Sequence, residues 1–491
     1  TNTKELFVNN HLYVGDLLPA WEHHFTNLST PAPNNNFTYD RYNRACQNIN
    51  NIRLLHEIDD NQSSLPIPIT KYEVREAINS LKKKKAKDST GLMAEHLQTG
   101  IIPVTGFLTP VIDKIIGTSD VPDEMTEGAT HPIQKKGKPK NISGNYRGIT
   151  ICPIVTKVMD TISLRHQKSS VYRDPDDLQF GFSNGRSGVH TAFILNECIA
   201  ESLDNKTPLY AASLDVMKAF DVVRHESLLD KLHDKGLTPT WWRLKDAVYK
   251  SLTTRVIWDS RLSNPIKMQQ GNCQGGLASP DDYISYLDDN LQILDTSNLG
   301  FHIGSMGFVS PTCADDMLIL ARSMFELQVL LKLVATYANE EHYVIHPEKT
   351  VILPLNIQSE QQIKHLEESM PWEINNAKLP VTKELVHVGI ERYLTSIDPT
   401  IDKRIANGRQ TLYGLFGSGM HGTNGLPVMT SVHLYQVYII PRIIFGLEAL
   451  VLKKTHFYNL EMLQRSILKS LLGVPKRTAI FCPWIGCIDQ A

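Results

Sequence analysis

The sequence predicts an α+β fold of several lobes, and three observations lead to this prediction. Short apolar runs typical of buried strands flank the acidic pair Asp315-Asp316, and another such run, residues 209–214, ends just before a third acid, Asp215. At 491 residues the chain is too long for one core, so lobes of roughly 100–200 residues are expected. Helical periodicity dominates the C-terminal part in three stretches: 401–416, 429–450 and 456–472.

The acidic residues predict a metal site. Asp315 and Asp316 lie on a tight turn between the runs Gly307–Val309 and Met317–Leu320, and a hairpin bend there would lift both carboxylates out of the sheet. A neighbouring strand would bring Asp215 alongside them. Because clustered carboxylates repel one another unless divalent cations lie between them, the cluster predicts Mg²⁺ or Mn²⁺ held together with substrate phosphates. An Asp-Asp pair alone is more often a solvated turn, so the neighbouring motifs matter.

A glycine-rich turn lies between these acids in the sequence. It runs from Gly271 through Gln274 and Gly275 to Ser279-Pro280, where a helix is predicted to begin with Ser279 as its cap and the proline in its first turn. A loop of this composition allows the backbone to approach a ligand closely.

A lysine follows downstream. An amphipathic helix is predicted over 327–342, and Lys349 then precedes a strand at 351–353, which would place it near the edge of the same sheet. Four residues suited to catalysis or ligand binding therefore occur in this order: Asp215, Gln274, Asp315 and Lys349.

With these motifs the chain resembles the reverse transcriptases of non-LTR (LINE-type, jockey-like) retrotransposons. Seven blocks in the family's order, spread over more than two hundred residues, make the resemblance specific. The blocks are Pro132–Gly137, Asn145–Ile149, Gln179–Ser187, Leu214–Asp221, Gln274–Pro280, Ala314–Asp316 and Lys349–Thr350.

The chain also departs from the family pattern. It has Cys313 where Tyr or Phe is common before Ala-Asp-Asp, Gly148 where Pro is usual, and His346 where Asn is usual. None of these changes removes a predicted metal ligand. Residues 85–91 align with a family block that is richer in Gly, Pro and Asp. This divergence raises the question of whether the element is fully competent for rapid DNA synthesis.

The resemblance implies a right-hand polymerase architecture, with helical and β fingers, an antiparallel-sheet palm and a helical thumb. His387–Ile390 resembles the family's primer-grip block. The implied segments are an N-terminal extension (1–65), fingers (66–205), palm (206–355), a connecting primer-grip region (356–391) and a helical thumb or C-terminal region (392–491).

The implied activity is RNA-directed DNA polymerisation, in which a primer 3′-hydroxyl attacks the α-phosphate of a nucleotide with the help of two Mg²⁺ ions, Mn²⁺ being an alternative. By resemblance, Asp215 and Asp315 hold both metals, and Asp316 lies nearby, either as a metal ligand or as an acid next to the ligands. The backbone carbonyl of Val216 helps to hold the metal of the triphosphate. Lys349 protonates the pyrophosphate leaving group as a general acid.

The remaining site residues select and bind the nucleotide. Phe220 matches the family's aromatic sugar gate, whose ring leaves no room for a 2′-hydroxyl; its alternative role is core packing. Gln274 and Gly275 are expected to lie against the template base or the incoming sugar. Arg147 and Lys136 are expected to reach the phosphates.

The charge of the chain is low for a protein that binds nucleic acid. Its formal net charge is −2, but counterion release depends on the lysines and arginines at the groove. The resemblance implies an RNA template, a DNA primer and dNTPs as partners. Of four local basic clusters, the second is expected to clamp phosphates and the third to be a solvated face: Lys82–Lys87, Lys135–Lys140, Lys453-Lys454 and Lys476-Arg477.

Composition excludes other classes of protein. No run of eighteen apolar residues and no signal peptide is evident, so no membrane association is expected. The seven cysteines lack paired C-x-x-C spacing, so reduced thiols are expected rather than a zinc ribbon or disulfides. A metal knuckle at Cys482 and Cys487 is a minor alternative. The implied location is intracellular, nuclear during integration, with a cytoplasmic ribonucleoprotein as an alternative.

Three local predictions concern other segments. The Asn-rich stretch 31–50 is predicted to be a mobile loop, and Thr70 with Glu73 predicts an N-capped amphipathic helix over 69–80. Asp221 is expected to cap or stabilise the helix that follows it. Because the first residue is Thr, the chain is expected to be an excerpt of a longer polyprotein.

Two other classes of protein remain as alternatives. One is a catalytically inactive reverse-transcriptase-like scaffold that only binds RNA; retention of all three acids argues against it. The other is an RNA-directed RNA polymerase, which shares the palm but typically has Gly-Asp-Asp and a polar residue at the position of Phe220. The sequence leaves open which RNA is copied, whether an endonuclease precedes this region, whether the element is active and which oligomer forms.

Overall fold

The computed structural model describes residues 4–59, 68–168, 175–355, 368, 372–393, 396–421 and 424–478. The chain forms two compact units, each assembled from three separate stretches. The first unit comprises Thr1–Asn184, Asp215–Ser297 and Leu331–His346, and the second comprises Gly185–Leu214, Asn298–Leu330 and Pro347–Ala491. The five contiguous segments expected from the sequence are a functional division and stay a prediction. Cys482 and Cys487 lie outside the described residues.

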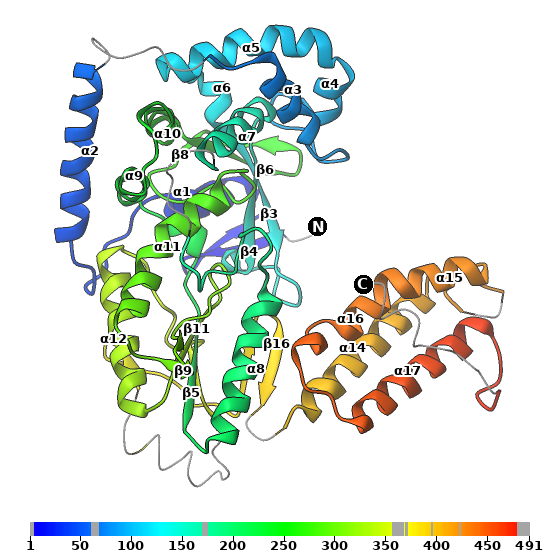
Figure 1. The fold of residues 1–491 in the computed structure, drawn as a ribbon. Helices are drawn as coiled ribbons and strands as arrows, with labels where there is room; N and C mark the ends of the chain where they lie inside the picture. The colour runs from blue at the N-terminus through cyan, green and yellow to red at the C-terminus, as the bar shows by residue number, and fades with distance from the viewer. Residues whose placement is uncertain are drawn as a thin grey trace. The chain divides into compact units, whose positions relative to one another are not determined.

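The first unit is built on a mixed sheet in the order β4-β3-β6-β7, with β8 also paired to β6 (Figure 1). Its strands are β1 (Glu5–Val8), β2 (His11–Val14), β3 (Glu127–Gln134), β4 (Tyr146–Ile151), β6 (Thr253–Trp258), β7 (Arg261–Leu262) and β8 (Ile266–Lys267). Its helices are α1 (Leu18–Ser29), α2 (Asp40–Asp59), α3 (Lys71–Ser80), α4 (Ala94–Thr99), α5 (Ile101–Thr118), α6 (Asp123–Thr126), α7 (Ile154–Lys168), α9 (His225–Asp234), α10 (Pro239–Ser251) and α11 (Ser279–Thr296). The 3₁₀ turns η1 (Ser143–Asn145) and η2 (Ala219–Val222) complete it, and α12 (Met324–Glu340) runs from the second unit into the first.

Helix α1 packs on this sheet and explains one departure from the family pattern. Trp21 is fully buried in a cluster with Val256 and Trp258 of β6. On β4, a Cβ atom at Gly148 would lie 2.4 Å from the Phe25 ring of α1 and 3.1 Å from Thr130. Glycine at position 148 therefore makes room for the N-terminal helix.

The prediction of a mobile loop at 31–50 is wrong from residue 40 onward, because helix α2 occupies Asp40–Asp59. Tertiary ion pairs hold this polar helix. Arg41 Nη1 lies 2.7 Å from Asp230 Oδ2, and Arg53 contacts both carboxylate oxygens of Asp246 at 2.6 and 3.0 Å. These partners lie almost two hundred residues away, so the local Asn-rich composition did not reveal them.

The predicted helix after Thr70 is confirmed as α3. Thr70 caps it, because its hydroxyl accepts a hydrogen bond from the Glu73 N–H while the Glu73 carboxylate accepts one from the Thr70 N–H. Buried Val74, Ala77 and Ile78 form its inner face. The cap and the apolar spacing are both local, which is why the sequence shows them.

The second unit is built on a three-stranded antiparallel sheet in the order β11-β5-β12. Its strands are β5 (Leu209–Leu214), β9 (Phe301–Ile303), β10 (Met306–Phe308), β11 (Met317–Ala321), β12 (Val351–Leu355), β13 (Glu373–Ile374), β14 (Ala377–Lys378), β15 (Glu384–His387) and β16 (Ile390–Tyr393). Its other elements are α8 (Gly188–Asp204), α14 (Asp398–Phe416), α15 (Val428–Leu434), η3 (Tyr435–Ile439), α16 (Ile440–Ile444), η4 (Leu447–Ala449) and α17 (Lys454–Leu472). Its core joins α8 to the sheet through Leu195, Leu209, Leu318 and Leu353.

The C-terminal helices confirm two of the three predicted stretches, as α14 and α17. The stretch 429–450 is not one helix but α15, η3, α16 and η4. Pro441 in the first turn of α16 removes a backbone donor. Gly446 then separates α16 from η4 with a φ of +79°, and a Cβ atom there would lie 2.5 Å from Ile390. The break lets the chain pass close to strand β16.

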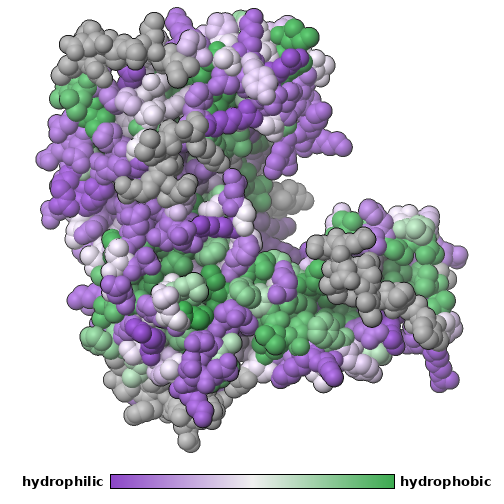
Figure 2. Space-filling model, viewed as in Figure 1, coloured by the Kyte–Doolittle hydropathy of each residue, from purple (hydrophilic) through white to green (hydrophobic). Residues whose placement is uncertain are grey.

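Figure 2 shows a broad apolar area on these C-terminal helices. Exposed aromatic and aliphatic side chains are frequent on them, including Tyr413, Met429, Tyr438, Phe457 and Tyr458. Two segments, Ile101–Thr118 and Val428–Ala449, also reach the length and apolar composition of a membrane-crossing helix. This is weak evidence for a membrane, because helices of a soluble core meet the same criterion; α5 packs against α3 and α10, and the second segment is broken.

Candidate active site

The ends of the three sheet strands place the predicted acids and the lysine. Leu214, the last residue of β5, pairs with Met317, the first residue of β11, and Val351 at the start of β12 pairs with Ser213. The chain therefore enters or leaves one end of this sheet at Asp215, at Asp316 and just after Lys349. This placement follows from strand register alone, as the sequence predicted.

The Asp315-Asp316 turn is tight, as predicted. The N–H of Cys313 donates to the carbonyl of Asp316 at 3.0 Å, and the N–H of Asp316 donates back at 3.1 Å. Ala314 has a φ of +59°, the left-handed conformation such a turn requires. Both acidic residues are exposed, whereas every residue of β11 is buried. A rigid buried strand thus carries two solvent-facing carboxylates.

The strand pairing around this turn differs from the prediction. β10 pairs with β9, and β11 pairs with β5, so the two predicted runs do not form one regular hairpin. One hydrogen bond of 2.9 Å, from the Leu320 N–H to the Val309 carbonyl, links them. β11 pairs along its whole length with the central strand β5, far earlier in the sequence, and periodicity within one run does not show that partner.

The backbone after β5 is held by the segment 344–346. The N–H of Met217 donates to the Val344 carbonyl, and the N–H of His346 donates to the Asp215 carbonyl, each at 2.8 Å. Val216 forms a bridge with Ile345. His346 makes this bond through its backbone N–H, so the bond to Asp215 does not depend on which side chain stands at position 346.

Three aromatic rings meet around Phe220. Phe220, half-buried in η2, stacks on the buried Tyr283 of α11 with ring centroids 4.5 Å apart and an interplanar angle of 19°. Phe182 approaches Phe220 edge-on, at 6.4 Å and 90°. Phe182 is 58% exposed and has a φ of +55°, which is uncommon for a residue other than glycine. The sequence reasoning missed Phe182 and Tyr283 as neighbours of Phe220.

The glycine-rich turn is fixed to the same region by its backbone. The N–H groups of Gly271 and Asn272 donate to the carbonyls of Val223 and Phe220 at 2.7 and 2.8 Å. The Thr150 N–H of β4 donates to the Gln274 carbonyl at 2.9 Å.

Close approach to β4 requires a glycine next to Gln274. Gly275 has a φ of +133°, and a Cβ atom there would lie 2.3 Å from the Thr150 carbonyl oxygen. The predicted helix follows as α11, with Pro280 in its first turn. Ser279 is not its cap, however, since Ala278 holds that position without a side-chain hydrogen bond.

The sequence suggested that Asp221 caps or stabilises the following helix. Asp221 does not cap it, because Arg224 occupies the position directly before α9. Asp221 Oδ1 accepts a hydrogen bond from Gln274 Nε2 at 3.1 Å. Burial raises the pKa of Asp221 to about 6, against the opposing effects of Lys218 and Gln274. The partner that matters is 53 residues away in sequence.

The two predicted phosphate ligands lie on the β3–β4 hairpin. Arg147 on β4 pairs in register with Ile133 on β3, and Lys136 follows β3 in the connecting loop. Both side chains are exposed, and neither forms an ion pair within the described part of the chain. A solvent-facing cation on a hairpin is suited to binding a phosphate.

The divergent block at 85–91 keeps one structural acid, which the sequence reasoning did not single out. Asp88 is buried and accepts hydrogen bonds from the backbone N–H groups of Thr90, Leu92 and Ile154 at 3.0, 2.8 and 2.9 Å. It thereby ties the lysine-rich loop to the start of α7. A short polar residue between a lysine run and a glycine is a turn signal that could have indicated it.

The predicted primer-grip residues form a hairpin between β15 and β16. His387 at the end of β15 is buried, and this burial lowers its pKa to about 4. Val388 and Gly389 turn with φ values of +47° and +74°. A Cβ atom at Gly188 of α8 would lie 3.0 Å from Val388 and 3.6 Å from Cys313. The hairpin therefore packs close to the Asp315-Asp316 turn within the second unit.

The donor set fits Mg²⁺. Among the described residues, no group of three or more His, Cys, Asp or Glu side chains is arranged to hold a metal by itself. Mg²⁺ is usually bound by one or two carboxylates together with water and substrate phosphates rather than by a cage of protein ligands. Asp315 and Asp316, two exposed hard oxygen donors on one turn, suit such a site.

Residues 133–366 match the family described as reverse transcriptase (RNA-dependent DNA polymerase). The matched residues include all three predicted metal ligands and the rings of Phe220, Phe182 and Tyr283. These residues form a reverse transcriptase domain. The domain contains β5, the Asp315-Asp316 turn and the glycine-rich turn.

Several proteins that resemble this chain come from mobile elements. The chain is 22% identical over 433 residues to the RNA-directed DNA polymerase of the mobile element jockey from Drosophila funebris, covering 84% of this chain and 45% of that protein. It is 25% identical to the probable RNA-directed DNA polymerase of transposon BS from Drosophila melanogaster, over 71% of this chain and 37% of that protein.

Another relative is the Pol polyprotein of the type-1 retrotransposable element R2 from Popillia japonica, 25% identical over 65% of this chain and 44% of that protein. The chain thus spans less than half of the length of each of these relatives. An apo telomerase structure from Candida tropicalis shares 13% identity over 60% of each chain, with a TM-score of 0.38.

Proposed function

We propose that this protein is an RNA-directed DNA polymerase of a non-LTR retrotransposon, extending a primer 3′-hydroxyl on an RNA template with dNTPs. The observation that carries the proposal is the convergence at one sheet end of the chain positions of Asp215, Asp316 and Lys349, inside a reverse transcriptase domain. The proposed activity would place the protein in the nucleus during integration, with a cytoplasmic ribonucleoprotein as the alternative location.

In the proposed reaction, Asp215, Asp315 and Asp316 would hold two Mg²⁺ ions. These ions, when bound, neutralise the charge that develops on the transferred phosphoryl group. Lys349 donates a proton to the pyrophosphate as it leaves. Its exposed position just before β12 leaves it accessible to a bound triphosphate.

The nucleotide is selected by residues of the first unit. The ring of Phe220, backed by Tyr283, forms a wall against a ribose 2′-hydroxyl. Gln274 and Gly275 lie on a loop that is held in place by backbone hydrogen bonds to neighbouring segments. Arg147 and Lys136 bind phosphates of the triphosphate or template.

Primer extension tests the proposal. Asp315→Asn keeps the shape of the turn but removes a metal-binding charge, so extension on a primed RNA template should fall by at least about a hundredfold while binding of the primer–template stays largely intact. Asp177→Asn, which removes a carboxylate from another loop of the domain, is the matched control and should extend normally.

Three outcomes would contradict the proposal or one of its parts. Extension by Asp315→Asn within a few-fold of the wild type would exclude the metal role of this residue. Binding of RNA by the wild type without extension under any Mg²⁺ or Mn²⁺ condition would favour the inactive scaffold. Extension with rNTPs at least as fast as with dNTPs would favour the RNA-directed RNA polymerase.

A further inference from the structure

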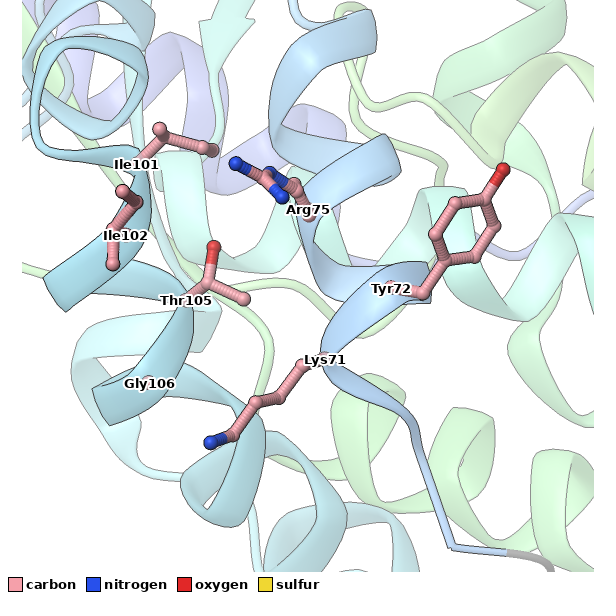
Figure 3. Close-up of a pocket in the computed structure, with 7 residues that line it drawn as sticks. All are labelled: Lys71, Tyr72, Arg75, Ile101, Ile102, Thr105 and Gly106. Atoms are coloured by element: carbon pink, nitrogen blue, oxygen red, sulfur yellow. The ribbon is translucent and has the colours of Figure 1, made fainter.

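A cavity of about 320 Å³ lies between helices α3 and α5 of the first unit (Figure 3). This volume is at the lower end of the range, roughly 300–1,000 Å³, in which small-ligand sites fall. None of its lining residues belongs to the matched reverse transcriptase domain. They are Lys71, Tyr72, Arg75, Ile101, Ile102, Thr105 and Gly106.

Two cations line one wall. Lys71 and Arg75 are one helical turn apart on α3, and Figure 3 shows both side chains directed toward α5, while Tyr72 points away. Neither forms an ion pair with a carboxylate in the described part of the chain. Glu73, the acid between them, is engaged by Thr70 and by His166 at 2.7 Å. Their charge is therefore available to a ligand.

The opposite wall, from α5, offers one polar and several apolar groups. Thr105 is only 6% exposed, and its Oγ1 has no hydrogen-bond partner among the described residues, which is a costly state for a buried hydroxyl. Figure 3 shows this oxygen directed toward the gap between Ile101 and Arg75. Gly106 adds no side chain and leaves open space where a Cβ atom would be.

The surrounding charge favours a polyanion. Residues 71–87 contain seven Lys and Arg against two Glu, whereas the whole chain carries a formal net charge of −2. Lys82–Lys87 continue this basic stretch directly after α3 and are exposed, and the loop is fixed by the buried Asp88. Single-strand binding sites combine a positively charged groove along the backbone with aromatic side chains that contact the bases; here Lys71 and Arg75 supply the charge, and Ile101 and Ile102 take the place of the aromatic rings.

We propose that the α3–α5 cavity binds one nucleotide of a single-stranded RNA outside the polymerase site. Lys71 and Arg75 would hold its phosphate, the Thr105 hydroxyl would donate to a phosphate or ribose oxygen, and Ile101 and Ile102 would contact the base. Only the choice of RNA as the bound strand rests on the proposed function. A free nucleotide carries the same chemical group, a phosphate ester on a sugar, and could be recognised by the same residues.

The test is a photocrosslinking titration, because it reports where the RNA lies. A single-stranded 12-nucleotide RNA containing 4-thiouridine is titrated on the full chain, and the crosslink to the peptide that contains Ile101–Gly106 is quantified by mass spectrometry. Arg75→Ala and Lys71→Ala should each raise the half-saturating RNA concentration about tenfold, the loss expected for one charge-assisted hydrogen bond.

Three further variants complete the design. Thr105→Val should weaken the crosslink a few-fold, and Thr105→Ser should restore it. Lys114→Ala removes an exposed charge from the same helix outside the cavity and should change the concentration less than twofold. AMP is the second probe; competition by AMP at the concentration at which the RNA strand itself binds would overturn the strand assignment in favour of a free nucleotide.

The outcome is separable from that of the proposed function. Asp315→Asn should abolish extension but keep this crosslink. Absence of a crosslink at Ile101–Gly106 in the wild type, or equal crosslinking by folded Arg75→Ala, would overturn the cavity proposal whether or not the chain extends primers. A crosslink that Arg75→Ala weakens would support it even if no extension were found.

Discussion

Phe220 is the residue whose proposed role is most open to test, because its ring is stacked on one face and half-buried. Phe220→Val should raise the ratio of kcat/KM for rNTPs to that for dNTPs by roughly a hundredfold, as relief of a clash of about 3 kcal/mol implies. Single-nucleotide extension on one template, with each pure nucleotide, measures the ratio. Tyr283→Phe keeps the supporting ring and should leave the ratio unchanged. An unchanged ratio in folded Phe220→Val would return this residue to core packing.

Asp221 gives a pH-dependent prediction. Its folded-state pKa of about 6 lies above the ordinary value of 3.8, so the folded state holds the proton more tightly than the unfolded state does. The stability from this group is therefore present at low pH and is lost as pH rises from about 4 to 6. Asp221→Asn can still accept the hydrogen bond from Gln274 and should be more stable than the wild type at pH 8, by about 1–3 kcal/mol.

Thermal unfolding at pH 5 and pH 8 measures this difference. The melting temperature of Asp221→Asn should exceed that of the wild type at pH 8, and the gap should shrink at pH 5. A variant that melts below the wild type at pH 8 would show that the charged carboxylate stabilises the fold, contrary to the raised pKa. Gln274→Leu should remove the partner and lower the melting temperature.

At the scale of elements, the packing of α1 on β4 depends on one small residue. Gly148→Ala would put a Cβ atom 2.4 Å from the Phe25 ring, and the resulting overpacking should cost about 1–3 kcal/mol. Phe25→Leu should lower the stability of the wild type but reduce the cost of the added methyl group. Thermal unfolding of the two single variants and the double variant measures a coupling of about 0.5–3 kcal/mol. Strict additivity would contradict the contact.

Elements with local signals could be predicted from the sequence. The capping box of Thr70 and Glu73, the helices α12, α14 and α17 and the apolar strands around the acids all show their pattern within a few residues. Helix α2 could not be predicted in the same way, because its stability depends on Asp230 and Asp246, far along the chain. The polar, Asn-rich composition of α2 reflects its exposed face and gives no sign of its ion pairs with these distant residues.

The candidate site likewise contains residues that the sequence could place and residues that it could not. Strand register fixes the positions of Asp215, Asp316 and Lys349 at one end of the sheet. The alternation of strands and turns in the sequence predicts these positions. Phe182 was missed because its orientation depends on a left-handed backbone and on a turn held by Gln179, whose Oε1 accepts the Gly181 N–H at 2.8 Å. Ring-to-ring contacts across 38 residues leave no periodic signal.

At the scale of the whole molecule, the distribution of charge matters more than its sum. Despite the formal net charge of −2, binding of a primer–template should weaken steeply with salt, each phosphate contact adding about 0.7–0.9 to the slope of log Kd against log[KCl]. Lys136→Ala should reduce this slope by about one, whereas Lys114→Ala should not change it. Fluorescence anisotropy between 50 and 300 mM KCl measures the slope. A slope near zero would contradict binding through local basic clusters.

The interleaving of the two compact units has a consequence for biosynthesis. Because the first unit needs residues 331–346 as well as 1–184, its last stretch emerges only after the 146 residues from 185 to 330 have been translated. At about 5–20 residues per second, that delay is roughly 7–30 seconds. During it, Glu341, which forms ion pairs with Arg41 and Lys231, is missing from the nascent chain. Ribosome-bound intermediates of this protein should therefore be natural clients of chaperones.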